Sequence, residues 1–231
     1  MSTDLAAESS NQIKNKIVAK EQAYWNEFYA KKFKVGVPSQ FCVMVATEAS
    51  KTQPLIEFGC GNGRDSMYMA RHGFNVYGCD LSGAAIQKLQ ETAEESKVQA
   101  KFSVCDVSEQ AAIRDIITSA RGGDATQNVT LYNRFFIHAL DDQQEQIFLS
   151  AMADSCIAGD LLYIETRCSL DEELQKEHGK SHFRRYVKSE ELIESLKSLG
   201  FNINYDITGQ GMAKYKAEDP FVTRIVCERK K

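Results

Sequence analysis

The sequence contains few prolines, no long apolar run and no recognisable targeting segment. No stretch of 18 apolar residues occurs among its 231 residues, so we expect no membrane-spanning helix. The first ten residues are polar and include Asp4 and Glu8, a pattern unlike that of a signal peptide. The three prolines, Pro38, Pro54 and Pro220, all fall at expected boundaries between elements. No internal repeat or low-complexity tract is present.

Closely spaced cysteines are also lacking. The seven cysteines are scattered and include no Cys-x-x-Cys pair; they stand at 42, 60, 79, 105, 156, 168 and 227. An odd number of scattered thiols, several inside expected strands, is typical of a reducing compartment, so we expect a cytoplasmic protein without disulfides. His178 and His182 have metal-ligand spacing on a helix, but no third ligand is evident and no metal is expected.

Neither sign of charge is in large excess. Lys and Arg number 28 against 32 Asp and Glu, a net charge of −4, so we do not expect a nucleic-acid partner. The candidate basic surface is a set of N-terminal lysines at 14, 16, 20, 31, 32 and 34. A composition of 43% hydrophobic and 26% charged residues suits one globular unit. We assign residues 1–50 to a helical lid and residues 51–231 to the main domain.

Strand-like and helix-like segments alternate from residue 54 onward. The expected strands are 54–58, 74–79, 99–105, 128–132 and 161–165, and the helices between and after them are 64–72, 83–96, 109–120 and 142–157. This alternation predicts an α/β fold with a parallel sheet and helices on both faces. After a helix at 190–199, two strands at 201–207 and 221–228 follow without a helix between them, which predicts an antiparallel last strand.

A glycine-rich turn follows the first of these strands. Residues 55–58 form a short apolar run that contains Glu57. Three glycines stand at alternate positions after it: Gly59, Gly61 and Gly63. Glycine allows positive φ and close approach of a ligand, and the helix beyond points unpaired N–H groups at the turn. The dinucleotide fingerprint requires glycine where Arg64 stands, and a phosphate loop requires Gly-Lys-Ser/Thr, so both ligand classes are disfavoured.

An acid followed by Gly-x-Gly-x-Gly resembles the first motif of class I (Rossmann-like) S-adenosylmethionine (SAM) methyltransferases, here of the bacterial small-molecule type. The resemblance covers about residues 54–228. It implies a seven-stranded, mostly parallel sheet with helices on both faces and an antiparallel last strand. It also implies SAM as the cofactor.

In such a sheet, ligands bind beyond the carboxyl ends of the strands. Asp80 ends the second strand and can accept hydrogen bonds from both ribose hydroxyls of SAM. Asp106 ends the third strand and can accept from the adenine amino group. Each of these acids precedes a helix, so each could instead cap that helix. The other expected cofactor contacts adjoin the glycine turn and these acids: Glu57, Cys60, Arg64, Leu81, Val107 and Asn133.

Residues 5–34 are expected to form an amphipathic helix that bears an aromatic cluster at Tyr24, Trp25, Phe28 and Tyr29. One interpretation is that this helix packs on the domain as a lid. The other is that Trp25 and Tyr29 cover the cofactor directly.

The candidates for chemistry lie beyond the fourth and fifth strands. We predict Arg134, His138 and Glu165 as catalytic residues. The run Arg134-Phe-x-x-His138-Ala resembles a stretch common in bacterial small-molecule members. Arg134 and His138 share a face if the segment is a helical turn. His138 has an alternative interpretation as a buried histidine that hydrogen-bonds the backbone at the edge of the core.

The loop at 168–188 has no acid from His178 to Ser189 and several cations. The predicted acceptor-binding residues lie in or beside it, and in the last hairpin: Arg167, His182, Arg184, Arg185, Tyr186 and Lys214. Arginine forks suit carboxylate and phosphate groups, which predicts a small anionic acceptor. Alternatively, the loop is solvated and its cations pair with the acids at 171, 172, 173 and 177.

These features together predict a SAM-dependent methyltransferase that acts on a small polar, anionic acceptor, with O-methylation favoured. The alternatives are a thiol, chalcogen or tRNA acceptor, or a non-catalytic SAM-binding partner subunit. Residues 132–135 replace the Asn/Asp-Pro-Pro-aromatic motif of the branch that methylates nucleobase amines, which disfavours DNA bases.

Overall fold

The computed structural model describes residues 2–174 and 183–230. Its strands are β1 (Leu55–Phe58), β2 (Val76–Asp80), β3 (Ala100–Val104), β4 (Thr130–Arg134), β5 (Leu161–Arg167), β6 (Phe201–Gly209) and β7 (Val222–Arg229). Its α-helices are α1 (Ser2–Lys32), α2 (Gln40–Glu48), α3 (Arg64–Arg71), α4 (Gly83–Ser96), α5 (Gln110–Arg121), α6 (Asp142–Ser155) and α7 (Ser189–Ser198). Two short 3₁₀ turns, η1 (Ile137–Ala139) and η2 (Ser169–Asp171), follow β4 and β5.

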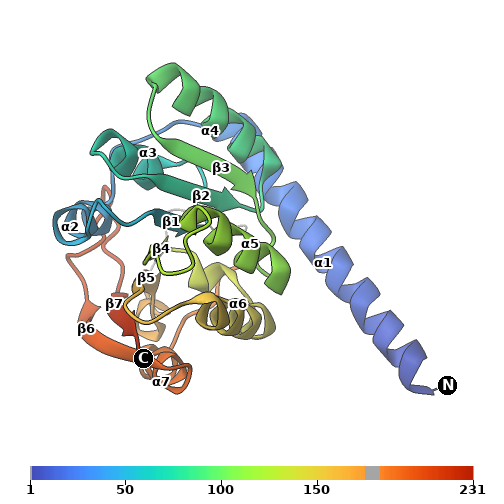
Figure 1. The fold of residues 1–231 in the computed structure, drawn as a ribbon. Coiled ribbons are helices and arrows are strands. Elements are labelled where there is room, and N and C mark those ends of the chain that lie inside the picture. Colours follow the sequence, from blue (N-terminus) through green and yellow to red (C-terminus); the bar gives the residue numbers. More distant parts are fainter. Residues whose placement is uncertain (1, 175–182, 231) are drawn as a thin grey trace.

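All seven strands form one sheet in the order β3-β2-β1-β4-β5-β7-β6 (Figure 1). β1 pairs in parallel with β2 and β4, and β7 is antiparallel to both of its neighbours. The predicted sheet, with its antiparallel last strand, is thereby confirmed. Since the order reverses between β1 and β4, the carboxyl ends of these two strands form the switch point where ligands bind.

β5 extends further than the sequence predicted. The strand continues to Arg167 because its ladder with β7 continues, pairing Thr166 with Thr223 and Arg167 with Val222. Arg167 therefore projects from a hydrogen-bonded strand end, where its backbone is fixed, and not from a loop.

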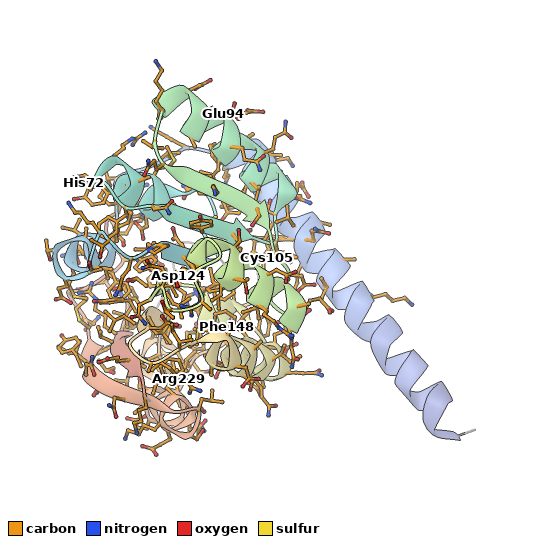
Figure 2. All side chains as sticks on the ribbon, viewed as in Figure 1. His72, Glu94, Cys105, Asp124, Phe148 and Arg229 are labelled. Atoms are coloured by element: carbon orange, nitrogen blue, oxygen red, sulfur yellow. The ribbon has the colours of Figure 1, made fainter. Side chains whose placement is uncertain are left out.

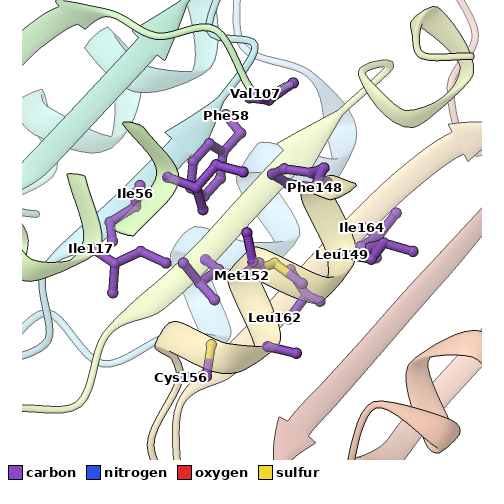
Figure 3. Packing of buried hydrophobic residues seen from close by; sticks show 14 of the residues in the cluster. Ile56, Phe58, Val107, Ile117, Phe148, Leu149, Met152, Cys156, Leu162 and Ile164 are labelled. Carbon is purple, nitrogen blue, oxygen red and sulfur yellow. The ribbon is translucent and has the colours of Figure 1, made fainter. Parts of the chain in front are cut away.

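Successive residues of the central strands point to opposite faces of the sheet, as the pleat requires. Ile56 and Phe58 join a core under α5, α6 and α7, and the Phe58 ring meets Phe148 edge-on at 5.1 Å between centroids (Figure 3). Leu55 faces the other way, into a core with residues of α2 and α3. Both faces are thus buried, which explains why these strands are apolar runs without alternation.

Helix α1 extends beyond the rest of the protein (Figure 1). Its N-terminal half projects away from the sheet, and its C-terminal half passes the carboxyl ends of β1, β2 and β3 (Figure 1). Asn26 Oδ1 accepts hydrogen bonds from Ser82 Oγ at 2.9 Å and from Ala84 N at 3.1 Å, at the start of α4. The Lys88 ammonium donates to the Tyr29 carbonyl at 3.1 Å. These contacts attach α1 to α4, and its role as a lid remains a prediction.

All seven cysteines are buried free thiols. Within residues 2–174 and 183–230, no helix has the length and apolarity to cross a membrane. In that same part of the chain, no three His, Cys, Asp or Glu side chains are grouped as a metal site would need. His178 and His182 lie outside the described residues.

Candidate functional site

The glycine turn adopts the backbone conformation that its composition predicts. Gly59, Gly61 and Gly63 have φ angles of +72°, +53° and +67°. The amides of Gly59 and Cys60 both donate to the Cys79 carbonyl, at 2.8 and 2.9 Å, which ties the turn to the end of β2. A Cβ on Gly59 would lie 2.3 Å from the Phe136 ring, so only glycine allows this close packing.

A cleft with about 720 Å³ of empty space opens in front of this turn. Three groups of residues line it: the ends of the first three strands, one face of α1, and the segment after β4. The lining residues are Glu21, Trp25, Tyr29, Gly59, Cys79, Asp80, Leu81, Cys105, Asp106, Val107, Phe135, Phe136, Ala139, Leu140 and Gln144. Seven predicted cofactor residues meet here: Trp25, Tyr29, Gly59, Asp80, Leu81, Asp106 and Val107.

Asp80 links the glycine turn to the start of α4. Its Oδ2 accepts from the Gly61 amide and its Oδ1 from the Ser82 amide, each at 2.9 Å. Burial raises the pKa of Asp80, while the Ser82 and Gly61 amides act in the opposite direction. The N-cap of α4 is Ser82, whose Oγ accepts from Ala85 N, so the interpretation of Asp80 as that cap is wrong. Asp80 is instead a carboxylate held at the cleft.

Asp106 is placed similarly after β3. Its Oδ1 accepts from the Ser108 amide at 2.9 Å, and its side chain lines the cleft beside Val107. Helix α5 starts at Gln110 with Glu109 in the capping position, so Asp106 does not cap it either. Cys105, labelled in Figure 2, precedes this acid and also lines the cleft.

Tyr29 closes the cleft above the glycine turn. A Cβ on Gly61 would lie only 2.4 Å from the Tyr29 hydroxyl. Burial, followed by the nearby Asp80 carboxylate, raises the pKa of the Tyr29 phenol. The ring therefore stays neutral and can act as a hydrogen-bond donor as well as an apolar wall.

The other predicted cofactor residues are not among those that line the cleft: Glu57, Cys60, Gly61, Gly63, Arg64 and Asn133. Glu57 is buried and accepts a hydrogen bond from Ser66 Oγ, and burial together with Asp65 raises its pKa. The Arg64 Nε lies 3.6 Å from Asp65 Oδ1. Asn133 is fully buried, and neither atom of its amide has a hydrogen-bond partner in the described part of the chain.

The sequence interpretation missed several lining residues. Glu21 precedes Trp25 and Tyr29 at intervals of four, so helical spacing could have placed it on the same face. Phe135 has φ of +54°, which is uncommon for a residue other than glycine, and no sequence signal indicates it. Gln144 is the N3 residue of a capping box with Asp141, a pattern that can indicate a helix start but gives no sign of the cleft.

A cluster of arginines lies next to Phe135. The Arg134 guanidinium stacks on the Phe135 ring, 3.9 Å from its centroid, and that of Arg167 lies 5.5 Å from it. Glu165 is fully buried between Arg134 Nε at 2.7 Å and Arg224 Nε at 2.8 Å. Although burial alone would lower the pKa of Arg134, the Glu165 carboxylate raises it. Glu165 therefore anchors two cations and does not line the cleft.

The structure separates the predicted acceptor-binding residues. Arg167 pairs with Asp171 at 2.8 Å and Glu218 at 3.2 Å. Burial, and then the charge of Arg167, lowers the pKa of Arg184, while Tyr186 and Asp171 act in the opposite direction.

Arg185 instead pairs with Asp142, at 2.5 Å, and with Glu145 on α6. Arg185 lines a second hollow, between α6 and α7. Its backbone amide donates to the His138 carbonyl at 2.8 Å. Tyr186 is half-buried, Lys214 is exposed in the hairpin before β7, and His182 lies outside the described residues. The alternative that the loop cations pair with the acids preceding them does not hold for Arg185, whose partners lie on α6.

His138 is buried in η1 and does not line the cleft. Its Nδ1 lies 3.2 Å from Thr166 Oγ1 and accepts from the Arg167 amide at 3.3 Å. A neutral ring that accepts at Nδ1 carries its proton on Nε2. This geometry is that of the backbone-bonded histidine which the sequence left open as an alternative, and it links η1 to β5.

The cleft offers two carboxylates on consecutive strand ends, a glycine turn that allows close approach, and aromatic and aliphatic walls. Such an arrangement can hold a nucleoside, with acids for its hydroxyl and amino donors and apolar side chains for the faces of the base. The arginine cluster begins at the Phe135 wall of the same cleft, so a second, anionic molecule could approach there.

Comparisons with known proteins agree with this geometry. Residues 55–154 match a family described as "Methyltransferase domain". No curated protein matches the sequence significantly. A SAM-dependent methyltransferase from Anabaena variabilis shares the fold, with 16% identity and a TM-score of 0.70 over 93% of this chain and 95% of that one. A SAM-dependent methyltransferase from Methanosarcina mazei has 16% identity and a TM-score of 0.65, over 81% and 97% of the two chains.

A third similar structure contains ligands. The 1,6-didemethyltoxoflavin N1-methyltransferase from Burkholderia thailandensis was solved with 1,6-didemethyltoxoflavin and S-adenosylhomocysteine. It has 12% identity and a TM-score of 0.66, over 96% of this chain and 90% of that one. At such identities the likeness concerns the fold.

Proposed function

We propose that this chain, whose residues 55–154 match a methyltransferase domain, transfers a methyl group from SAM to a small, polar and anionic acceptor, most readily on oxygen. The acceptor would occupy the arginine cluster beyond Phe135. The observation that carries this proposal is the position of the Arg134 and Arg167 guanidiniums over the ring of Phe135, which lines the cofactor cleft.

The cofactor fits the cleft group by group. The ribose hydroxyls suit Asp80, which already accepts from two amides and has further acceptor sites. The adenine amino group suits Asp106. The methionine end of SAM would lie by the glycine turn in this arrangement, and the segment after β4 would face its methyl group.

Replacing Asp80 by alanine is expected to weaken the binding of S-adenosylhomocysteine by roughly 1.5–3 kcal/mol, as for hydrogen bonds to a charged group. Asp80→Asn retains one acceptor oxygen and should lose less. Titration calorimetry of the wild-type protein and both variants measures the difference. Asp115→Ala, on the exposed surface of α5, is the matched control and should bind normally. Unchanged affinity in Asp80→Ala would contradict the cofactor site.

Positive charge beside the cleft favours an anionic ligand. Arg167 already pairs with Asp171 and Glu218, yet its charge still lowers the pKa of Arg184, after the effect of burial. A carboxylate or phosphate that bridged the two guanidiniums would relieve this repulsion and form charge-assisted hydrogen bonds. Arg134, stacked on Phe135, would orient the acceptor towards the methyl group.

An anionic oxygen also fits the chemistry. In the transfer, the acceptor oxygen attacks the methyl carbon in line with the carbon–sulfur bond, which breaks to leave neutral S-adenosylhomocysteine. Alignment of the two reactants supplies much of the rate enhancement. A carboxylate or phosphate oxygen is already deprotonated at neutral pH, so it needs no general base. This is consistent with the placement of His138 and Glu165, which hold backbone and arginines in position.

The proposal is tested with methyl-labelled SAM and a metabolite extract that has been split by anion exchange. Label is expected in the retained, anionic fraction. Arg184→Gln should then raise the KM for that fraction about tenfold with a smaller effect on kcat, because it removes binding and not chemistry. Arg185→Gln is the matched control, since Arg185 is the next residue in the sequence but pairs with Asp142 and Glu145 on α6.

Three outcomes would contradict the proposal in different ways. Label found only in the unretained fraction excludes an anionic acceptor. Label in bulk tRNA indicates the nucleic-acid alternative. Binding of SAM without transfer to any fraction indicates a partner subunit that binds the cofactor and does not turn over.

A further inference from the structure

Helix α1 presents a stripe of three residues to the cofactor cleft. Glu21, Trp25 and Tyr29 follow one another at intervals of four, and all three line the cleft. Tyr29 lies over the glycine turn, next to Gly61. Glu21, two turns away, lies at the opposite end of the cleft, where Asp106 is close enough to raise its pKa.

The side chain of Glu21 is held in place by the start of α6. Gln144 Nε2 donates to Glu21 Oε2 at 3.1 Å. The side-chain amide of Gln144 cannot flip without losing a hydrogen bond, because its Oε1 accepts from the Asp141 backbone amide at 2.9 Å in the capping box. Gln144 therefore fixes Glu21 as an acceptor. A carboxylate has about four acceptor sites, and Gln144 uses one of them.

The carboxylates of Glu21 and Asp106 both line the cleft, and among the described residues no cationic side chain lines it with them. Burial, and to a smaller extent Asp141 and Asp106, raises the pKa of Glu21. Among the residues that line the cleft, none is a lysine or an arginine. A ligand group with two N–H donors would satisfy both Glu21 and Asp106, and the amino group of adenine is such a group.

We propose that Glu21 accepts one hydrogen of the adenine amino group while Asp106 accepts the other, so that α1 helps to select a 6-aminopurine cofactor. This inference rests on SAM as the cofactor and is independent of the methyl acceptor. A 6-oxopurine would place its carbonyl oxygen, an acceptor, against two carboxylates. Trp25, one turn along the stripe, would cover the base from the same side.

The proposal makes Glu21 a specificity-determining residue of the cofactor site. It also gives α1 a direct contact with the ligand, in addition to its attachments to α4. Sites that are built to hydrogen-bond a polar group discriminate strongly against an analogue that cannot reciprocate, because buried partners are left unpaired. The discrimination should therefore depend on the carboxylate of Glu21 itself.

Titration calorimetry with S-adenosylhomocysteine and its deaminated analogue S-inosylhomocysteine tests this directly. The wild-type protein is expected to bind the adenosyl compound at least tenfold more tightly. Glu21→Gln should weaken the adenosyl compound by about tenfold. It should also bind the inosyl compound at least as well as the wild type does, because a glutamine amide can donate to the carbonyl oxygen.

Two controls separate recognition from helix docking. Glu27→Gln changes an exposed acid on the same helix, paired with Lys31, and should alter neither affinity. Gln144→Ala removes the contact that holds Glu21 and keeps the carboxylate, so the preference for adenine should fall by less than in Glu21→Gln. Equal preference in Glu21→Gln and wild type would overturn the proposal. If the wild-type protein binds neither compound, the cofactor assignment fails as well.

Discussion

Replacing Glu165 by alanine is expected to lower the free energy of unfolding by about 3–5 kcal/mol, the range for removing one partner of a buried ion pair. Glu165 is fully buried and holds Arg134 at 2.7 Å and Arg224 at 2.8 Å. Alanine would leave two guanidiniums buried beside each other without a carboxylate. Chemical denaturation, followed by the fluorescence of the single tryptophan and by circular dichroism, measures the loss.

A triple variant of the same residues separates the effect of unpaired buried charge on stability from the effect of lost side-chain volume. Arg134→Met and Arg224→Met, combined with Glu165→Met, replace the whole cluster by apolar side chains and should recover most of the lost stability. Glu194→Ala, which removes an exposed partner of Lys197, should change stability by less than about 0.5 kcal/mol. A loss below about 1 kcal/mol in Glu165→Ala would mean that Arg134 and Arg224 find other partners, against the expectation from buried pairs.

Gly59→Ala is expected to cost about 2–5 kcal/mol of stability and to weaken S-adenosylhomocysteine binding more than tenfold. The φ angle of +72° strains an alanine by about 1–2 kcal/mol. In addition, the new Cβ would lie 2.3 Å from the Phe136 ring, and overpacking costs about 1–3 kcal/mol. Phe136 packs edge-on against Phe148 at 5.2 Å, so its ring would be displaced into the cleft that it lines.

Gly122→Ala separates the two contributions. Gly122 ends α5 with φ of +63°, and a Cβ there would meet nothing within 4 Å. This variant should show the backbone strain alone, about 1–2 kcal/mol, with normal cofactor binding. The two variants are compared by denaturation and by calorimetry. If Gly59→Ala were no worse than Gly122→Ala in both measurements, close packing at the glycine turn would not be required.

Much of the cofactor end could be predicted from local sequence. The strand-helix alternation predicted the sheet, and Asp80 and Asp106 were predicted at strand ends that meet at one edge. These signals are readable because each depends on residues within one strand, turn and helix start. The sequence did not reveal that Ser82, and not Asp80, caps α4, since both residues favour capping and differ in position by only two.

The acceptor end was less predictable. Arg184 and Arg185 are neighbours in sequence, but the charge of Arg167 lowers the pKa of Arg184, whereas Arg185 pairs with Asp142 and Glu145 on α6. Adjacent residues of an extended segment point to opposite sides, and which side faces the site depends on what packs there. Arg224 gave no signal, because its partner Glu165 is far away in sequence and meets it through the β5–β7 register.

The sequence by itself determined the fold class, the glycine turn and the acids at the strand ends, because hydrophobic period, turn chemistry and chain order are local properties. Only the tertiary structure decided which side chains share the cleft. Glu21 and Gln144, 123 positions apart, meet there because α1 crosses the edge of the sheet at which α6 begins. Contacts of that kind depend on how whole elements pack, which no short stretch of sequence encodes.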